Sequence, residues 1–251
     1  MRIVLLADNF IGLKTVEFLV AKSENIVGLF LHPKDFQNYS EEIIRASKLP
    51  ADKIFYIGRE WGGEDISRLE NLRPDLILVV FWRYILPEQV FNFPPLGCIN
   101  FHLSYLPYNR GKKPNVWPII ENTPAGVSLH FIDKGIDSGE VIARRKVDVE
   151  QFDTAKSLYE KLILAFPSLF EETWPFIKKG TTQGIKKEVE GTFHLDRDFH
   201  RLDEIDLNKK IYPLDLINHL RAKTFSPHPA AYFVKDGKKI FVRVEFECVE
   251  I

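Results

Sequence analysis

The segment "RIVLLADNFIGLKTVEFLVAKSENIVGLFLH", residues 2–32, contains a strand, a helix and a second strand in succession. Residues 2–7 and 26–32 are short apolar runs rich in β-branched side chains, which is the pattern of strands buried on both faces. Between them, residues 12–22 carry apolar side chains at spacings of three and four, as an amphipathic helix does. Two strands joined by a helix form a parallel pair with a right-handed crossover. The segment therefore predicts an α/β fold built on a parallel sheet.

The same alternation continues along the first half of the chain. Further strands are expected at 53–58, 75–81 and 98–102, with helices between them. The pattern then changes, because the apolar runs 126–133 and 140–149 are joined only by "KGIDSG", which is too short for a crossover helix. These two strands are expected to be antiparallel. A long helix with apolar residues at spacings of three and four follows, ending near Trp174.

A second, smaller subdomain is expected after residue 180, where the chain becomes polar and loop-like. A short helix is predicted at 213–223, and a β-hairpin is predicted around the Asp236-Gly237 turn. We therefore expect two domains, residues 1–180 and 181–251, the second an α+β subdomain that supplies substrate or dimer contacts.

Composition excludes several classes of protein. The chain has 251 residues, of which 34 are Lys or Arg and 35 are Asp or Glu, so its net charge of −1 gives no general attraction to nucleic acid. Its two cysteines, Cys98 and Cys248, form no metal or disulfide pattern and are expected to be free thiols. No apolar run approaches the ~20 residues that span a bilayer, and no signal peptide is expected at the N-terminus. A cytoplasmic location is expected.

Common cofactor motifs are missing from the sequence. The turn after the first strand, "ADNFIGLKT", has one glycine instead of the G-x-G-x-x-G of a dinucleotide site, and no GxxxxGK[ST] occurs anywhere. A metal site built from Asp133, Asp137 and Glu140 was considered, but the spacing fits no calcium loop. No metal is expected.

Asn100 and His102 lie two residues apart at the end of the predicted strand 98–102, so they share one side of it. Ligands of open α/β sheets bind beyond the carboxyl ends of the strands. Asp137 lies between Gly135 and Gly139 in the short connection between the antiparallel strands. Taken singly, the Asn-x-His pair is equally compatible with a polar sheet edge, and Asp137 with a turn-forming residue.

Together the three residues suit acyl transfer to an amine. A histidine beside a carboxylate can accept a proton near neutral pH, because the anion stabilises its charged form. An asparagine N–H can donate to a developing oxyanion. Ser104 and Cys98 do not look activated, which favours direct attack by an amine without a covalent enzyme intermediate.

The segment "NFHLSYLPYNRGKKPNVWPIIENTPAGVSLHFIDKGIDSGEVI", residues 100–142, resembles the core of the folate-dependent formyltransferases. The shared motifs are Asn-x-His within H-x-S-x-L-P, followed by a D-x-G-x-D-x-G-type loop. The resemblance extends over residues 1 to about 180 and implies a Rossmann-like, mostly parallel catalytic domain. It also implies that His102 is the general base or proton shuttle, that Asn100 polarises the formyl oxygen, and that Asp137 orients His102.

The resemblance further implies that the formyl donor is N10-formyltetrahydrofolate, with the pterin against "FWRYILPE" (81–88) and the loop before Asp137. The side chains expected to bind folate are Phe81, Trp82, Tyr84, Ile85, Leu86, Ile132, Asp133 and Lys134. Packing in the core is the alternative for the aromatic and aliphatic members. The side chains expected to bind the acceptor substrate are Asn9, Phe10, Ser104, Arg110, Lys112 and Lys113. For the basic ones, the alternatives are a pyrophosphate contact and a solvated loop.

The C-terminal part is similar to that of sugar N-formyltransferases, which act on nucleotide-linked 4-amino-4,6-dideoxyhexoses or related amino sugars. That branch implies a role in surface polysaccharides such as the lipopolysaccharide O-antigen. Formylation of methionyl-tRNA is the main alternative, and the charge balance argues against it. A non-catalytic folate-binding module and a hydrolase that transfers the formyl group to water remain open. No nucleic-acid or membrane partner is expected, and a homodimer is possible.

Overall fold

The computed structural model describes residues 1–182, 184–185 and 190–249. It divides into two compact units, each assembled from separate parts of the chain. The first unit comprises Met1–His102, Ser128–Arg144 and Phe166–Lys187. The second comprises Leu103–Val127, Arg145–Ala165 and Glu188–Ile251. The predicted boundary near residue 180 stays a prediction.

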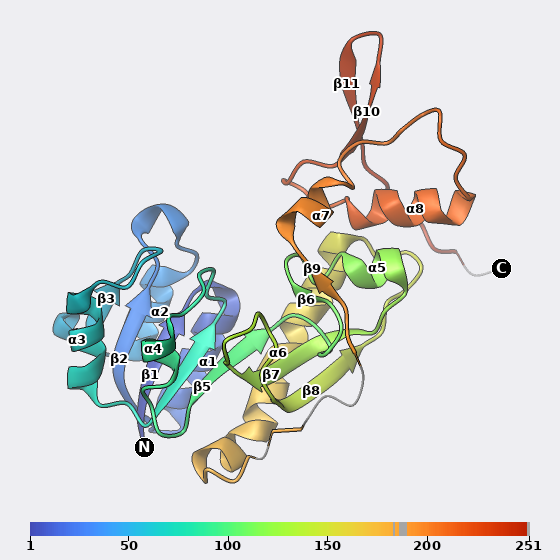
Figure 1. Ribbon diagram of the computed structural model, residues 1–251. Coiled ribbons are helices and arrows are strands. Elements are labelled where there is room, and N and C mark those ends of the chain that lie inside the picture. The colour runs from blue at the N-terminus through green and yellow to red at the C-terminus, as the bar shows by residue number, and fades with distance from the viewer. Residues whose placement is uncertain (183, 186–189, 250–251) are drawn as a thin grey trace. The chain divides into compact units, whose positions relative to one another are not determined.

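The chain forms a seven-stranded sheet of order β3-β2-β1-β4-β5-β7-β8 (Figure 1). Most of this sheet belongs to the first unit, and the first residues of β7 and the last residues of β8 belong to the second. The pairs from β3 to β5 are parallel, and β7 pairs antiparallel with β5. The strands are β1 (Arg2–Ala7), β2 (Asn25–Leu31), β3 (Ile54–Tyr56), β4 (Leu76–Val80), β5 (Cys98–His102), β7 (Ala125–Phe131) and β8 (Val141–Val147). The expected Rossmann-like, mostly parallel sheet is therefore confirmed.

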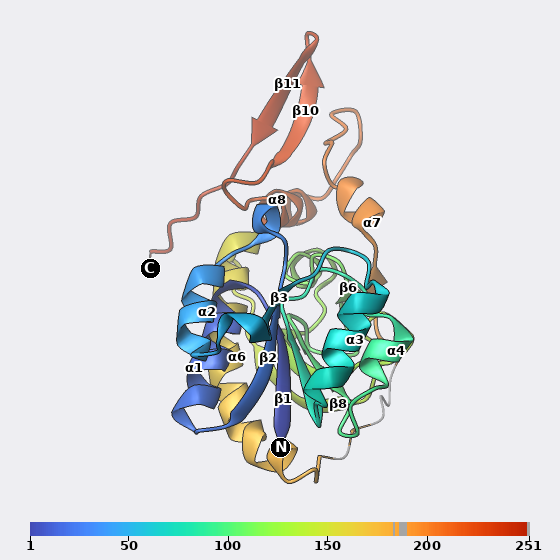
Figure 2. The ribbon, with the colours of Figure 1, turned by 90° about the vertical axis from the view of Figure 1, so that its left-hand side faces the viewer.

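Helices cover both faces of the parallel part of the sheet. Figure 2 shows α1 (Asn9–Ala21) and α2 (Ser40–Ser47) on one face, and α3 (Gly63–Leu72) and α4 (Glu88–Phe91) on the other. Short 3-10 helices lie at Lys34–Phe36 and Ala51–Lys53. Every residue of β4 is buried, which is why this strand is a continuous apolar run rather than an alternating one.

The second unit contains shorter elements. These are β6 (Arg110–Gly111) paired with β9 (Phe193–His194), helices α5 (Trp117–Glu121), α7 (Asp196–His200) and α8 (Pro213–Ala222), and the first part of the long helix α6 (Ala155–Lys178). The predicted hairpin is confirmed: β10 (Ala231–Lys235) and β11 (Lys238–Val242) are antiparallel. Asp236 and Gly237 both have positive φ, 49° and 71°, as a two-residue turn of this kind requires.

A buried guanidinium holds part of the second unit together. Arg221 is 6% exposed, and its Nη1 donates to the carbonyl oxygens of Glu150 and Asp153, both at 2.9 Å. Its Nε donates to Asn218 Oδ1 at 2.9 Å. The guanidinium of Arg221, which belongs to α8, therefore donates hydrogen bonds to backbone carbonyls of the segment that precedes α6, and these bonds hold that segment against α8.

Substitution Arg221→Met is expected to lower the free energy of unfolding by about 3 kcal/mol, because several hydrogen bonds from a charged group are lost and buried acceptors stay unpaired. Urea unfolding followed by circular dichroism measures this. Arg201→Met is the matched control, since that side chain is 74% exposed, and it should change the free energy by less than about 0.5 kcal/mol. Equal effects of both substitutions would contradict the assigned role of Arg221.

Candidate active site

The order of the strands reverses between β1 and β4. The chain leaves β1 toward β2 and β3 on one side, then continues at β4 on the other, and ligands of such sheets bind at this switch point. The strand ends are joined there by Asp8 N, which donates to the carbonyl of Val80 at 3.0 Å. Asn9 and Phe81 follow these strands, and both have positive φ, 65° and 58°. Two predicted site residues therefore lie at one edge of the sheet.

The antiparallel pairing of β5 with β7 sets which side chains meet. Asn100 lies opposite His130, and His102 lies opposite Ser128. Alternate residues of a strand share a face, so these four side chains project from the same side of the sheet. The intervening Phe101 projects to the other side.

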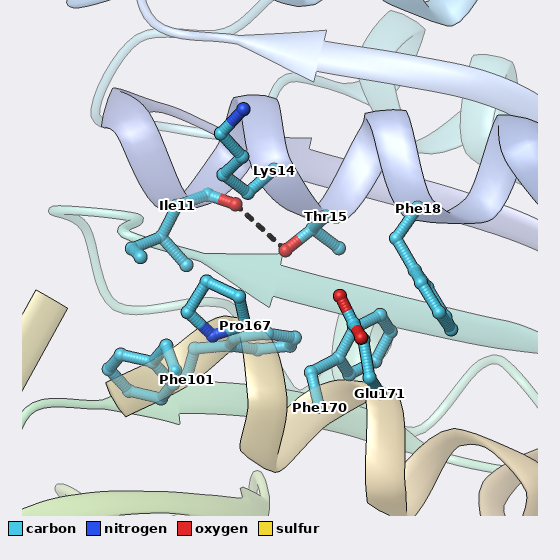
Figure 3. A pocket seen from close by; sticks show the side chains of 9 residues that line it. Ile11, Lys14, Thr15, Phe18, Phe101, Pro167, Phe170 and Glu171 are labelled. Carbon is cyan, nitrogen blue, oxygen red and sulfur yellow. Dashed lines mark hydrogen bonds between the residues drawn. The ribbon is translucent and has the colours of Figure 1, made fainter. Parts of the chain in front are cut away.

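Phe101 packs against the aromatic side chains of α6, with ring centroids 5.7 Å from Phe166 and 5.1 Å from Phe170. Figure 3 shows it with Pro167 and Phe170 of α6, facing Ile11 and Thr15 of α1, at a shallow pocket. This pocket lies on the opposite face of β5 from Asn100 and His102, so it is no part of the candidate site.

One carboxylate oxygen is shared by three polar side chains. Asp137 Oδ1 lies 3.5 Å from His102 Nδ1, 3.5 Å from His130 Nε2 and 3.4 Å from Asn100 Nδ2. The Asp137 and His102 side chains are 12% and 10% exposed. The three residues predicted from the sequence as catalytic are therefore brought together, at the carboxyl end of β5. These separations are long for hydrogen bonds, and such contacts commonly tighten when a substrate binds.

The loop between β7 and β8 holds Asp137 by local contacts. Asp133 Oδ1 accepts from the backbone N–H of Gly135 at 3.0 Å and from the hydroxyl of Ser138. A Cβ at Gly139 would lie 1.8 Å from the carbonyl oxygen of Phe131, so only glycine fits there. Asp137 has φ of 49°, and the loop maintains this unfavourable conformation. Asp133, predicted to bind folate, thus also closes the loop that carries Asp137.

His130 was missed by the sequence analysis. Its side chain is 2% exposed, its Nε2 lies 3.1 Å from Asn100 Nδ2, and its Nδ1 lies 2.8 Å from the carbonyl oxygen of Phe131. The available signal was its place in the antiparallel strand: pairing 126–133 with 98–102 can bring a polar side chain opposite Asn100. Finding His130 in this way requires knowing which residues of the two strands lie opposite each other, and local sequence does not show that.

The residues predicted to bind folate lie in two neighbouring segments of the first unit. Lys134 forms an ion pair with Glu88 at 3.1 Å, which links the loop before Asp137 to the segment after β4. Trp82 and Ile132 pack against the same core cluster, which includes Leu86. Leu86 is 5% exposed, whereas Ile85 is 77% exposed. Leu86 is therefore a core residue, whereas the side chain of Ile85 is accessible to a ligand.

An aromatic stack supports the segment after β4. The rings of Trp82 and His32 are stacked with centroids 3.9 Å apart, and Tyr84 meets His32 edge-on at 5.3 Å. Trp82 Nε1 is buried and finds no hydrogen-bond partner among the described residues. Because this nitrogen is enclosed, the stack supports the segment from within and does not present the donor at the surface.

His32 is held in its neutral form. Burial lowers its pKa, and the positive charge of Arg83 lowers it further, to about 4. The side chain is 1% exposed, and its Nε2 accepts from the backbone N–H of Arg83 at 3.4 Å. A neutral ring can stack on Trp82 without burying a charge.

The remaining predicted substrate residues are distributed over both units. Phe10 belongs to the first unit and meets Tyr39 edge-on at 6.1 Å. Ser104, Arg110, Lys112 and Lys113 belong to the second. There, Arg110 lies over the ring of Phe193 at 5.6 Å, and Lys113 lies over Phe199 at 5.3 Å. Ser104 is 1% exposed, and the carbonyl of Lys112 accepts from the indole of Trp117 at 2.8 Å.

Within the part of the chain that the structure describes, no group of three or more His, Cys, Asp or Glu side chains is placed to hold a metal ion. In the same part, no helix is long and apolar enough to cross a membrane.

Comparison with known proteins agrees with this geometry. Residues 21–171 match the family model described as formyl transferase, and residues 198–247 match the N-formyltransferase dimerization C-terminal domain. The first match covers more than half of the chain and contains Asn100, His102, His130 and Asp137. The chain therefore belongs to the formyl transferase family. The predicted family is confirmed, and with it the prediction of a transferase.

Individual relatives are similar over most of their length. The dTDP-4-amino-4,6-dideoxyglucose formyltransferase of Mycobacterium bovis is 34% identical over 176 residues, covering 70% of this chain and 74% of the relative. A 4-N formyltransferase from Francisella tularensis has a crystal structure similar to this one, with a TM-score of 0.86 and 28% identity over 99% of this chain and 98% of that chain.

A second similar structure contains ligands. The formyltransferase PseJ from Anoxybacillus kamchatkensis, in complex with UDP-4,6-dideoxy-4-formamido-L-AltNAc and tetrahydrofolate, has a TM-score of 0.59 and 26% identity, covering 89% of this chain and 99% of that chain. Methionyl-tRNA formyltransferases also occur among the sequence relatives.

The depressed pKa of His32 predicts a pH dependence of stability. The unfolded state takes up a proton as the pH falls below about 6.5, whereas the folded state does so only near pH 4, so acidification through this window favours unfolding by up to about 3 kcal/mol. In His32→Phe this contribution disappears, and the free energy of unfolding should fall less steeply between pH 6.5 and 4. Urea titrations at several pH values measure the slope. Identical slopes for both proteins would show that His32 is not buried in its neutral form.

Proposed function

We propose that the protein transfers a formyl group from N10-formyltetrahydrofolate to the amino group of a nucleotide-linked amino sugar, a 4-amino-4,6-dideoxyhexose. The observation that carries this proposal is the convergence of Asn100, His102 and Asp137 at the carboxyl end of β5, in a chain of the formyl transferase family. Support for the sugar comes from the Mycobacterium bovis relative, and support for the donor and the nucleotide from the ligands of PseJ.

His102 is the proposed proton carrier. Its Nδ1 faces Asp137 Oδ1 at 3.5 Å, so the carboxylate favours the tautomer with the proton on Nδ1 and stabilises the ring when it becomes charged. Nε2 is then the nitrogen that accepts the proton which the sugar amine loses on acylation. At 10% exposure the side chain is shielded from water, which strengthens its interaction with Asp137.

Asn100 is the proposed support for the formyl oxygen. The sugar amine attacks the formyl carbon of the donor and forms the new C–N bond. Negative charge develops on the formyl oxygen, and an Asn100 N–H directed at it stabilises that charge. The bond between the formyl carbon and N10 then breaks, and N10 takes up the proton that His102 accepted, so that tetrahydrofolate leaves. The amide is already oriented by its neighbours on β7 and in the loop, so it needs no reorganisation when the charge appears.

The proposed donor site is formed by the segment after β4 and the loop before Asp137. The exposed Ile85 offers apolar surface there, and the stack of Trp82 on the buried His32 supports the segment that carries it. In the first unit, the proposed acceptor contacts are Asn9 and Phe10, which follow β1. In the second unit, taken by itself, the proposed acceptor contacts are Ser104, Arg110, Lys112 and Lys113.

A nucleotide sugar is favoured over tRNA as the acceptor. Binding to RNA depends on many phosphate contacts, and the net charge of −1 provides no general excess of basic side chains. The match of residues 198–247 to an N-formyltransferase dimerization domain points the same way. We propose that the protein acts in the cytoplasm on precursors of a surface polysaccharide, such as the lipopolysaccharide O-antigen, without a nucleic-acid or membrane partner.

Formyl transfer is tested by following release of tetrahydrofolate in the presence of a panel of dTDP- and UDP-linked amino sugars. We expect release that depends on the amino sugar, and a loss of about 10²–10⁴-fold in kcat for His102→Ala and of about 10²–10³-fold for Asn100→Ala. His200→Ala is the matched histidine control, since that side chain is 64% exposed in the second unit, and it should retain full activity.

Three results would contradict the proposal. Release that needs no amino sugar would indicate a hydrolase, and saturable folate binding without release would indicate a non-catalytic binding module. Salt-sensitive binding of tRNA, together with formylation of its methionyl form, would replace the sugar as the acceptor.

We also propose that the protein is a homodimer formed by the C-terminal domain. Apolar side chains of the hairpin are accessible in the described chain: Val234 is 46% exposed, Ile240 41% and Phe241 51%. Exposed apolar side chains gathered on one element are typical of an interface, and the family match of this region names dimerization.

The dimer predicts a change of mass on substitution. Ile240→Asp should shift the protein from dimer to monomer by at least about 10-fold in the dissociation constant, because a charge would be buried at the interface. The nearby Lys238→Asp changes an exposed charge on the same strand and should leave the dimer intact. Sedimentation equilibrium measures both. A wild-type monomer at all concentrations would contradict the proposal.

A further inference from the structure

His130 is buried in the middle of the candidate site and has no role in the scheme above. It comes from β7, faces Asn100 across the strand pair, and is 2% exposed at its side chain. Each of its ring nitrogens has a partner: Nδ1 lies 2.8 Å from the carbonyl oxygen of Phe131, and Nε2 lies 3.1 Å from Asn100 Nδ2.

The contact with Phe131 fixes the position of the ring proton. A carbonyl oxygen can only accept, so Nδ1 must carry the hydrogen that it donates at 2.8 Å. In the neutral ring the other nitrogen, Nε2, then has a lone pair and no hydrogen. In the neutral ring Nε2 is therefore an acceptor, placed 3.1 Å from the amide nitrogen of Asn100. Nε2 also lies 3.5 Å from Asp137 Oδ1, a separation longer than an ordinary N–H···O hydrogen bond, and only a ring protonated on both nitrogens could donate there.

This acceptor determines which way the Asn100 amide points. Nδ2 lies between two acceptors, His130 Nε2 at 3.1 Å and Asp137 Oδ1 at 3.4 Å. If the amide were turned over, its oxygen would face the lone pair of Nε2 and the carboxylate, and both contacts would be repulsive. The shorter contact, with His130, is the stronger hydrogen bond.

The two amide hydrogens are consequently not equivalent. One is held by His130 Nε2, and the other makes, among the residues that the structure describes, only a long contact with Asp137. A substrate oxygen can compete for the second hydrogen without disturbing the first. The amide thus keeps its orientation while one N–H is offered to the substrate.

We infer that His130 is a positioning residue for acyl transfer: its Nδ1-protonated tautomer makes Nε2 the acceptor that holds Asn100 with an N–H directed at the formyl oxygen. This inference rests on the proposed function. It assigns His130 no direct contact with the substrate, so its removal should affect kcat much more than KM.

Two amide substitutions separate positioning from simple support of the fold. The amide of His130→Gln reaches about as far as Nε2, and its oxygen can accept from Asn100. The amide of His130→Asn reaches only as far as Nδ1, so it can keep the bond to Phe131 but not the one to Asn100. His130→Leu keeps neither bond. If His130 only supports the fold, His130→Asn should retain the most activity. If His130 positions Asn100, His130→Gln should retain the most activity.

We expect kcat to fall about 10–100-fold in His130→Leu and in His130→Asn, as is common for residues that orient a catalytic group. His130→Gln should recover at least 10-fold of that loss, and KM for donor and sugar should stay within about 3-fold of wild type in all three. Full activity of His130→Asn, or no recovery in His130→Gln, would overturn the inference. So would a loss that appears in KM alone.

The tautomer is measured independently of turnover. Two-bond ¹H–¹⁵N spectra of the full chain labelled at histidine distinguish a protonated from an unprotonated ring nitrogen, and His130→Gln identifies the signal. We expect Nδ1 to be protonated and Nε2 unprotonated at neutral pH. A hydrogen on Nε2 would overturn the inference even if formyl transfer is normal. If the unaltered protein transfers no formyl group, the proposed function fails, and the role of His130 toward a formyl oxygen fails with it.

Discussion

The antiparallel pairing of β7 with β5 is the constraint on which the candidate site depends. In the parallel part of the sheet, neighbouring strands run in the same direction and end at the same edge. The antiparallel partner adds side chains from mid-strand, so that His130 lies opposite Asn100 and Ser128 lies opposite His102. If β7 were shifted by one residue against β5, the side chains of His130 and Ser128 would point to the other face of the sheet, away from Asn100 and His102. The antiparallel pairing therefore places His130 and Ser128 next to the Asn100 and His102 pair at the end of β5.

A single negative charge organises this cluster. Asp137 Oδ1 is within 3.5 Å of two imidazole rings and one amide, and the loop that carries it is closed by Asp133 and restricted by Gly139. The two histidines differ in their second partner, since only His130 is bonded to the carbonyl of Phe131. In the proposed mechanism the two rings have separate roles: His102 carries a proton, and His130 holds Asn100 through Nε2.

Local sequence was sufficient for the elements and for part of the site. Buried strands produce continuous apolar runs, and the two-residue spacing of Asn100 and His102 places both on one face, so strand and motif were visible together. His130 was not found, because its role arises from pairing between strands about 30 residues apart, and register is a tertiary property. The sequence left Leu86 as either a folate contact or a core residue; its 5% exposure places it in the core cluster, and the folate contact stays a prediction. The discontinuous composition of the two units likewise depends on chain crossings that no local pattern records.

The most direct test of the account follows the formyl carbon itself. With N10-formyltetrahydrofolate labelled with ¹³C in the formyl group and a dTDP-linked 4-amino-4,6-dideoxyhexose, ¹³C NMR distinguishes a formamide on the sugar from free formate. The account predicts that the label appears in the sugar formamide at the rate at which tetrahydrofolate is released. Label that accumulates as formate, or that stays on the folate while every amino sugar is unchanged, would contradict it.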